Sequence, residues 1–376
     1  MKRLIILATI LVVFVGSSAF LQEKAYTIAQ LRALYSGDPT KWPKPELHDE
    51  AKPGFKDIGY LGRPTYPANN PFSEEKQKLG KILFFDPRLS VSGQIACASC
   101  HDPELGWGDG RRVAYGHSRQ TGKRNAMTLI NVAFYEKFFW DGRATSLEDQ
   151  AKFPVQDHVE MATDLTIMVK NVAAVAGYRP LFAQAFGSEE ITLDKIQKAI
   201  ATFERSIVST NSRFDSFVKG NSKILKDDEV MGLHLFRTKA GCINCHNTPL
   251  FSDNKFHNDG QALLGSRMED RGKYNLTKNL KDIGSFKTPS LRETNITGPW
   301  MHHGNFPSLK DVIEFYNLGN PISYQRAHVI PDSLKNPKSA MLKKLNLTLT
   351  EQQQLEAFLK SISTQVQKIM PPKLPE

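Results

Sequence analysis

Several features are scarce in this chain of 376 residues, and each scarcity narrows what the protein can be. Only four cysteines are present, and all four belong to the short motifs described below, so none remains for a structural disulfide. Alternating polar and apolar patterns are few, which argues against a fold rich in β-structure. No basic stripe is interleaved with aromatic residues, so we expect no nucleic acid partner.

The hydrophobic run at the N-terminus is short. Lys2 and Arg3 precede an apolar segment at residues 4–15, and small residues follow at 16–19. A basic, an apolar and a small-residue region in this order are typical of a secretory signal peptide, here over residues 1–19. The run is too short to span a bilayer comfortably, although an uncleaved segment could still serve as a membrane anchor.

Two copies of one motif contain all the cysteines. They are Cys97-Ala-Ser-Cys100-His101 and Cys242-Ile-Asn-Cys245-His246. The pattern C-x-x-C-H attaches c-type haem: both thiols bond the porphyrin edge, and the histidine ligates the iron. A redox C-x-x-C pair, half of a zinc site or a disulfide could each explain one copy alone. None explains why every cysteine recurs with the same trailing histidine, so the sequence predicts two covalently bound haem c groups.

The mature chain is long enough for two domains that each bury a haem. After the signal peptide we expect an extended N-terminal arm at 20–70, which is rich in Pro, Gly and charge. A first haem domain at 71–219, a second at 227–362 and a Pro-rich tail at 363–376 follow. The two motifs lie 145 positions apart, which is too far for short tandem repeats and fits a duplicated one-haem unit.

Most periodic segments are typical of helices. Thr192 is expected to cap a helix whose apolar face holds Leu193, Ile196, Ile200, Phe203 and Ile207. Ser308 is expected to cap another, with Asp311 in the reciprocal position, Tyr316 on its apolar face and Gly319 at its end.

Thr350 with Gln353 is expected to open the last helix. The best strand candidate is a short hairpin near residues 251–261. Together these patterns predict a mainly α fold, cytochrome c-like in each half, with long loops around the cofactors and little β-structure.

Two haems alone would make an electron carrier, whereas an enzyme needs an iron with an accessible face and acid–base groups beside it. Further motifs lie around and between the two haem motifs. Those of the first half are Gly116-His117, Lys123-Arg124-Asn125, Trp140-Asp141-Gly142-Arg143 and Val159-Glu160-Met161. Those of the second are Phe286-Lys287-Thr288-Pro289-Ser290-Leu291-Arg292, Pro299-Trp300-Met301-His302-His303-Gly304 and the helix after Ser308. With these motifs in this order, the chain resembles the bacterial dihaem cytochrome c peroxidase family over residues 71–362, a family that also contains the MauG-type enzymes.

The resemblance implies roles for individual residues. His101 would be the proximal ligand of a peroxidatic haem, and His246 that of an electron-transfer haem. Glu160 matches the family's distal acid–base glutamate and Gln150 its distal amide: a carboxylate can move peroxide protons while an amide orients the peroxide. Trp140 lies where the family places a tryptophan between the haems. Without the resemblance, Glu160 and Gln150 would be ordinary surface residues and Trp140 a core indole.

Two positions bear on the subtype. Tyr316 matches the second haem's distal ligand, which is methionine in the peroxidases and tyrosine in MauG-type enzymes; a phenolate lowers the reduction potential relative to a thioether. Met301 is the alternative ligand, and Tyr316 would then be a core tyrosine. His117 matches a histidine that ligates the resting first haem in many family peroxidases, and Gly116 and Gly122 would let its loop move. The alternative is that His117 is an ordinary exposed histidine that never reaches the iron.

Asn125, Thr297 and Pro299 match the family's inter-domain calcium site, and their oxygen atoms suit that cation. The sequence differs from MauG at Ala240. At this position, two residues before its second motif, MauG has a surface tryptophan and uses it to draw electrons from its protein substrate. The sequence therefore gives no support for electron transfer from a protein substrate by this route.

The leading hypothesis is a periplasmic dihaem peroxidase that reduces hydrogen peroxide with electrons from a small redox protein, a cytochrome c or a cupredoxin. Haem c is attached outside the bacterial inner membrane, which agrees with the signal peptide. Loss of Lys2 and Arg3 with that peptide lowers the formal charge from +10 to +8, which suits an acidic partner or simply a soluble basic protein. The resemblance also implies homodimerisation.

Two alternatives stay open from the sequence. The first is a MauG-like oxidase that forms a high-valent state to modify a protein or small substrate. The second is a dihaem electron carrier without catalysis, which would keep both irons six-coordinate and would not react with peroxide.

Overall fold

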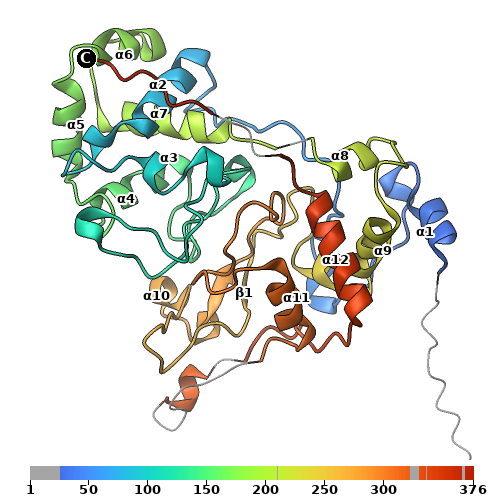
Figure 1. Ribbon diagram of the computed structural model, residues 1–376. Coiled ribbons are helices and arrows are strands. Elements are labelled where there is room, and N and C mark those ends of the chain that lie inside the picture. The colour runs from blue at the N-terminus through green and yellow to red at the C-terminus, as the bar shows by residue number, and fades with distance from the viewer. Residues whose placement is uncertain (1–25, 210, 322–329, 336, 366–368) are drawn as a thin grey trace, which may run out of the picture.

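The computed structural model describes residues 26–209, 211–321, 330–335, 337–365 and 369–376. Helices joined by long loops dominate these residues (Figure 1), which confirms the mainly α prediction. None of these helices is long and apolar enough to cross a membrane, and the signal peptide expected at 1–19 lies outside the described residues. The elements are α1 Ile28–Tyr35, α2 Glu74–Phe85, α3 Leu147–Gln150, α4 Lys152–Gln156, α5 Leu165–Ala173, α6 Tyr178–Phe186, α7 Leu193–Arg205, α8 Arg213–Val218, α9 Asp227–Arg237, β1 Phe256–Asn258, α10 Tyr274–Thr277, β2 Ser285–Lys287, α11 Leu309–Asn317 and α12 Leu349–Ser361.

One pair of tightly packed helices organises each half of the molecule: α2 packs on α7, and α9 packs on α12. A Cβ added at Gly80 of α2 would lie 1.9 Å from the carbonyl oxygen of Ala199 in α7. A Cβ added at Gly232 of α9 would lie 2.0 Å from that of Gln354 in α12. Only glycine permits so close an approach. The same glycine-mediated helix contact occurs in both halves, which indicates that they share one architecture.

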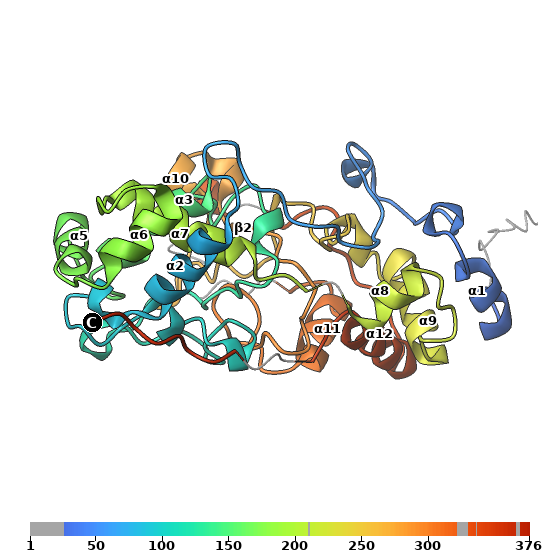
Figure 2. The ribbon, with the colours of Figure 1, turned by 90° about the horizontal axis from the view of Figure 1, so that it is seen from above.

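Two clusters of buried apolar side chains surround these helix pairs, and Figure 2 shows the two groups of helices at opposite ends of the molecule. The first cluster includes Leu83, Phe84, Ile200 and Phe203. The second holds several phenylalanines in edge-to-face contact, such as Phe236 and Phe358 with ring centroids 5.3 Å apart. Such pairs contribute beyond their buried area, so each half has a core of its own.

The two ends of the chain each pack on the half that is distant in sequence. The N-terminal arm is not simply extended as expected, because Leu31 and Tyr35 lie four positions apart on one face of α1 and are buried where that helix packs on α9. The C-terminal tail instead returns to the first half, near α6 (Figure 1), where the Glu376 carbonyl oxygen accepts a hydrogen bond from the Gly177 amide at 2.9 Å.

Two of the expected helix starts are correct and one is wrong. Thr192 caps α7 and Ser308 caps α11, and Gly319 follows the end of α11 with a φ of +80°. The last helix begins after Thr348 rather than at Thr350. Thr348 and Glu351 form the reciprocal capping box there, and this pair satisfies two of the free amides at the helix start.

The hairpin expected near residues 251–261 does not form. Strand β1 pairs antiparallel with β2 instead, with His257 opposite Phe286. Within 252–255 the side chains of Ser252 and Asp253 accept hydrogen bonds from amides two residues on, so this segment forms local turns rather than a strand. The strand partner therefore comes from the loop that carries the second half's Phe286 motif.

Candidate haem and active sites

Both C-x-x-C-H motifs fold into the same turn. Short 3-10 helices span Cys97–Ser99 and Cys242–Asn244. The amide of each motif histidine donates to the carbonyl of its first cysteine, at 3.0 Å for His101 and 2.9 Å for His246. None of the cysteines forms a disulfide. Two distant segments thus place two thiols and one imidazole in the same arrangement.

One hydrogen bond orients each motif histidine. Nδ1 of His101 lies 3.1 Å from the carbonyl oxygen of Trp107, and Nδ1 of His246 lies 3.1 Å from that of Phe251. A carbonyl only accepts, so Nδ1 carries the proton and Nε2 is left with a free lone pair. Burial lowers the pKa of both imidazoles, which keeps them in the neutral form that binds iron.

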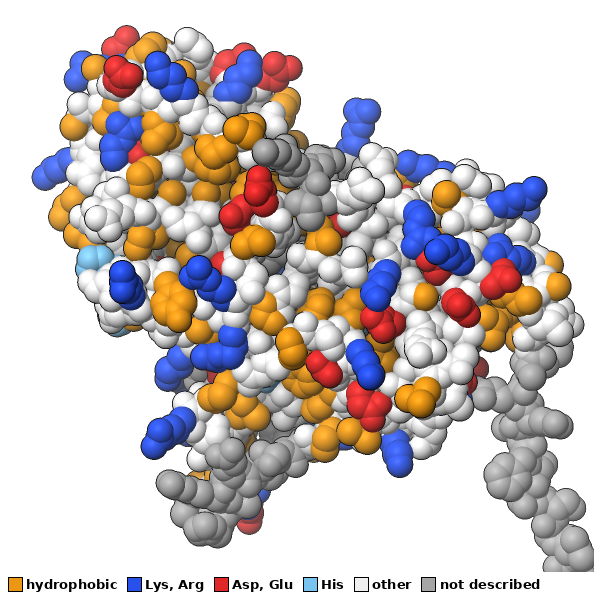
Figure 3. Space-filling model, viewed as in Figure 1, with side chains coloured by type: hydrophobic (Ala, Val, Ile, Leu, Met, Phe, Trp, Pro, Cys, Tyr) orange, Lys and Arg blue, Asp and Glu red, His pale blue; other side chains and the backbone are white. Residues whose placement is uncertain are grey.

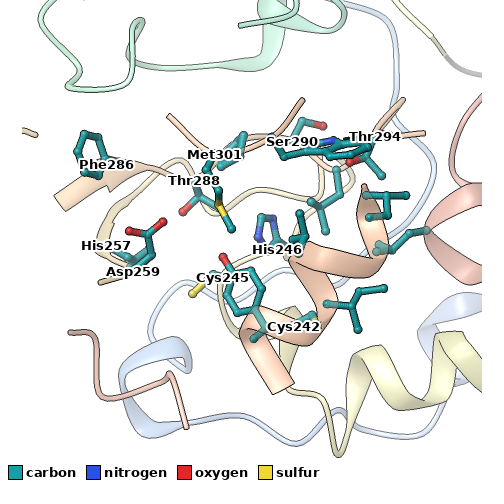
Figure 4. A pocket seen from close by; sticks show the side chains of 18 of the residues that line it. Cys242, Cys245, His246, His257, Asp259, Phe286, Thr288, Ser290, Thr294 and Met301 are labelled. Atoms are coloured by element: carbon teal, nitrogen blue, oxygen red, sulfur yellow. Dashed lines mark hydrogen bonds between the residues drawn. The ribbon is translucent and has the colours of Figure 1, made fainter. Parts of the chain in front are cut away.

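A cavity adjoins each motif. The first-half cavity is lined by Cys97, Cys100 and His101, and the second-half cavity by Cys242, Cys245 and His246. Figure 4 shows His246 and Met301 facing into the second of these from different segments. The remaining lining is largely apolar, as a porphyrin requires.

Several buried polar atoms beside these cavities have no hydrogen-bond partner among the described residues. They include Oε2 of Glu204 in the first cavity and both ring nitrogens of His302 in the second. Native proteins rarely leave such atoms unpaired. These orphaned atoms fit a bound group with polar substituents, and haem, with its two carboxylates, is such a group.

Glu160 and Gln150 both line the first cavity. Gln150 is the last residue of α3, and Glu160 lies in the loop after α4. Burial raises the pKa of Glu160, the Asp157 carboxylate raises it further, and the Arg143 guanidinium opposes both. The structure thus places a carboxyl group and an amide in the cavity of the first motif.

A more open pocket shares two lining residues with the first cavity. Arg143, Phe153, Gln156, Asp157, His158 and Glu160 line it. Arg143 and Glu160 also line the first cavity, so they stand between that cavity and solvent. The Arg143 guanidinium stacks 3.5 Å from the centroid of the Phe139 ring and pairs with Asp141. In the sequence alone, Arg143 is distinguished only as part of the Trp-Asp-Gly-Arg run.

His117 does not line the first cavity in this structure. Its amide donates to the Glu160 carbonyl at 2.7 Å, and its Nδ1 is buried without a partner among the described residues. A Cβ added at Gly116 would lie 2.1 Å from the carbonyl oxygen of Val159. The two loops are therefore in close backbone contact, and the His117 loop supports the Glu160 loop.

Trp140 belongs to the wall between the cavities. Asn125, Met127, Thr128, Tyr135, Trp140 and Lys287 line both of them. The Trp140 indole donates to the Asn125 carbonyl at 3.0 Å. The sequence points to Trp140 but to neither Tyr135 nor Lys287, although Lys287 belongs to one of the motifs that carry the resemblance.

Tyr316 and Met301 both line the second cavity, so lining alone does not choose between them as ligands. Burial raises the pKa of Tyr316 well above its ordinary value, and the negative charge of Asp259 adds to this effect. The phenol is therefore neutral unless a cation binds its oxygen.

The three expected calcium ligands, Asn125, Thr297 and Pro299, all line the second cavity. The Asn125 side-chain amide donates to the Arg111 carbonyl at 2.9 Å, which leaves its Oδ1 atom as an acceptor. The set consists of oxygen donors, as calcium prefers.

Cys245 also belongs to a second group of possible metal ligands. One ligand atom from each of Cys245, Asp253 and His257 lies within 4.8 Å of the others. Burial opposes a proton on His257, but hydrogen bonds to Asp253 and Cys245 outweigh it and raise its pKa to about 10. Because Cys245 recurs as Cys100 in the matching motif, we assign it to haem rather than to a separate metal.

Comparison with known proteins agrees with this geometry. Residues 74–223 match the family model of di-haem cytochrome c peroxidase. The cytochrome-c peroxidase IdrP1 of Pseudomonas sp. (strain SCT) is 36% identical, with 79% of this chain and 83% of the relative covered. The methylamine utilization protein MauG of Methylorubrum extorquens is 39% identical, with 82% and 84% covered.

Two solved structures share the architecture. One is the crystal structure of a MauG-like protein associated with microbial copper homeostasis, with 31% identity, a TM-score of 0.72, and 81% of this chain and 93% of that chain covered. The other is the diheme peroxidase BthA from Burkholderia thailandensis, with 23% identity, a TM-score of 0.66, and 82% and 92% covered; it shows the shared fold. The chain therefore belongs to the dihaem cytochrome c peroxidase family of oxidoreductases, which includes both the peroxidases and the MauG proteins.

Proposed function

We propose that this protein reduces hydrogen peroxide to water with electrons from a small redox protein. The observation that carries the proposal is that Glu160 and Gln150 line the same cavity as His101. Haem bound there would supply the iron at which the peroxide O–O bond is reduced. The overall reaction consumes one peroxide, two electrons and two protons and yields two waters.

Glu160 is the proton carrier in this proposal. Its carboxylate takes a proton from one peroxide oxygen and delivers it to the oxygen that leaves as water. Gln150 orients the peroxide through its amide. The more open pocket that Glu160 shares with Arg143 supports this role, because it offers substrate and protons a path from solvent.

Trp140 is proposed to carry electrons between the two haem sites. Its place in the wall between both cavities supports this role. The hydrogen bond from its indole to the Asn125 carbonyl fixes the ring across that wall. Residues 71–219 and 227–362 would then be a peroxidatic and an electron-transfer haem domain, and the two separate cores support this division.

The proposed axial ligands are His101 for the first haem and His246 with Tyr316 for the second. The free Nε2 atoms of the histidines and the position of Tyr316 on the second cavity support this set. His117 is proposed as a ligand only in a state in which its loop has left Glu160. Asn125, Thr297 and Pro299 are proposed to bind one calcium ion.

We propose a periplasmic location on the strength of the signal-like residues 1–19 and the need to attach haem c outside the inner membrane. The electron donor would be a cytochrome c or a cupredoxin. On the face shown in Figure 3, basic side chains are scattered among acidic ones over both halves, so the positive excess of the chain is not gathered there into one docking patch. Homodimerisation remains part of the proposal.

A MauG-like oxidation of a protein or small substrate is the second candidate. Tyr316 on the second cavity favours it, and two proteins named MauG are 38% and 39% identical to this chain. Ala240 is 5% exposed and lines the second cavity. An oxidisable side chain is therefore missing at the position that MauG uses to reach its protein substrate.

Electron paramagnetic resonance of the oxidised protein, before and after one-electron reduction and then with added peroxide, tests the proposal. A high-spin ferric signal that peroxide consumes in the oxidised protein indicates an open first site and supports MauG-like chemistry. Two low-spin signals, with peroxide reactivity only after half-reduction, indicate that His117 gates the first site. If neither sample reacts, the protein is an electron carrier and the proposal is wrong.

A further inference from the structure

Lys287 is a buried cation in the wall between the two cavities. It ends β2 and is only 2% exposed. Its amide donates to the Trp140 carbonyl at 2.8 Å, and it lines both cavities. The backbone thus ties this lysine to the residue that we propose as the electron path.

The Lys287 ammonium has no anionic partner among the described residues. Its Nζ atom lies 3.1 Å from the centroid of the Tyr135 ring. The Tyr135 hydroxyl accepts a hydrogen bond from the Ser290 amide, and burial raises its pKa to about 12, so it supplies no negative charge. Nothing that the described residues hold near Nζ balances its charge.

The other cations of these cavities differ from Lys287. Arg124 and Arg143 both pair with the Asp141 carboxylate. Lys343, which lines the second cavity, is exposed to solvent. The deeply buried Arg237 and Arg292 elsewhere in the chain pair with Asp57 and Asp215, respectively.

An unpaired buried ammonium is costly, because the interior does not replace the water that solvated it. Burial alone holds the pKa of Lys287 well below its ordinary value. The cost is offset if the mature protein brings an anion to the same wall. Each haem carries two carboxylates, and both cavities that Lys287 faces belong to haem motifs.

We propose that Lys287 is the counter-cation of a haem carboxylate at this wall, and that its charge raises the reduction potentials of both haems. The inference rests on the proposed function only in that both motifs hold haem. Ferric haem carries one more positive charge than ferrous haem, so a nearby ammonium disfavours the ferric form. Because Lys287 borders both cavities, one charge acts on both irons. Lys287 thus acts indirectly, through the reduction potentials of the haems, and is not a catalytic residue.

Spectroelectrochemical titration of the purified dihaem protein tests this inference without turnover. In Lys287→Met, which keeps the length of the side chain and removes its charge, both midpoint potentials should fall. Lys287→Arg should keep both near the wild-type values. Lys310→Met, at an exposed position of α11, is the matched control and should change neither.

Unchanged potentials in a Lys287→Met protein with two haems would overturn the inference, and a shift confined to one haem would overturn the claim that the charge is shared. If Lys287→Met does not fold, Lys287→Gln takes its place with the same expectations. A wild-type protein that holds two haems but does not react with peroxide would instead defeat the proposed function. The titration would still decide the role of Lys287.

Discussion

At the scale of single residues, one short hydrogen bond to each motif histidine sets which ring nitrogen carries the proton and which can bind iron. The carbonyls of Trp107 and Phe251 hold Nδ1 of the two motif histidines, and both residues have a left-handed backbone, with φ of 59° and 58°. This conformation is uncommon outside glycine. It recurs at the same functional place in each half, so it serves to aim the carbonyl at the imidazole.

The first residue-scale prediction concerns Glu160. Replacing it in Glu160→Gln keeps the size of the side chain and removes the group that we propose moves protons. Peroxide turnover should fall by about 10²-fold or more, the usual scale for losing an acid–base group. Steady-state peroxide consumption measures this, with haem content checked by absorbance. The exposed Glu136→Gln is the control, and turnover like that of the wild type in Glu160→Gln would remove Glu160 from the mechanism.

The second residue-scale prediction concerns Tyr316. If its phenolate ligates the second haem, Tyr316→Met should raise that haem's midpoint potential by on the order of 0.1 V, because axial ligands tune haem potentials over roughly 0.8 V. Tyr316→Phe should change the absorption spectrum of the same haem. Phe315→Leu on the same helix controls for packing. An unaltered spectrum and potential in both Tyr316 variants would leave Met301 as the ligand.

At the scale of elements, each half depends on two helices that approach closely at a glycine. The α9 and α12 backbones meet at Gly232, where an added Cβ would lie 2.0 Å from a carbonyl oxygen. Backbone atoms cannot yield as a flexible side chain would, so the helices would have to move apart.

Gly232→Ala should therefore destabilise the protein. Alanine favours a helix over glycine by about 1 kcal/mol, but overpacking costs about 1–3 kcal/mol and, with a backbone clash, the upper end applies. Urea unfolding followed by circular dichroism should show a lower midpoint. Gly62→Ala, where an added Cβ meets no atom within 4 Å, should leave the midpoint unchanged. An equal or higher midpoint in Gly232→Ala would mean that the helices separate freely.

At the scale of the whole molecule, a charged cluster joins the two halves beside the wall. Arg124 of the first half pairs with Asp270 of the second at 2.6 Å and with Asp141 of its own half at 2.7 Å. Burial would raise the pKa of Asp270, but hydrogen bonds and charge from Arg124 outweigh burial and leave this pKa below its ordinary value.

This shift gives a pH-dependent stability with a defined sign. A carboxyl whose pKa is lower in the folded state stabilises the fold fully above its unfolded pKa of about 3.9, and this contribution is lost as the pH falls from there through the lower, folded pKa. At pH 7, Asp270→Asn should lower the free energy of unfolding by about 1.5–3 kcal/mol, the range for a hydrogen bond to a charged group. The difference from the wild type should shrink below pH 4.

Urea titrations at pH 7 and at pH 3.5 measure this contribution, and Glu189→Gln, at an exposed position of the loop between α6 and α7, is the control. If the free energies of unfolding of the wild type and Asp270→Asn differ by the same amount at both pH values, Asp270 contributes through its shape rather than its charge.

The chemistry that depends on covalent spacing can be predicted from the order of residues in the chain. Both haem motifs, the mainly α fold and the caps at Thr192 and Ser308 follow from neighbours a few positions apart, since local hydrogen bonds and thiol spacing need no distant partner. The Thr350 start was wrong by two residues because two capping patterns overlap there, and only Thr348 closes with Glu351.

Features that depend on contacts between distant segments became known from the folded chain alone. β1 pairs with β2, and α1 of the N-terminal arm packs on α9. The His117 loop contacts Glu160 and does not enter the first cavity. The shared wall with Lys287 and Tyr135 likewise exists only after both halves come together. Burial and pairing of charges are properties of the assembled interior, because they depend on which groups replace water around each side chain.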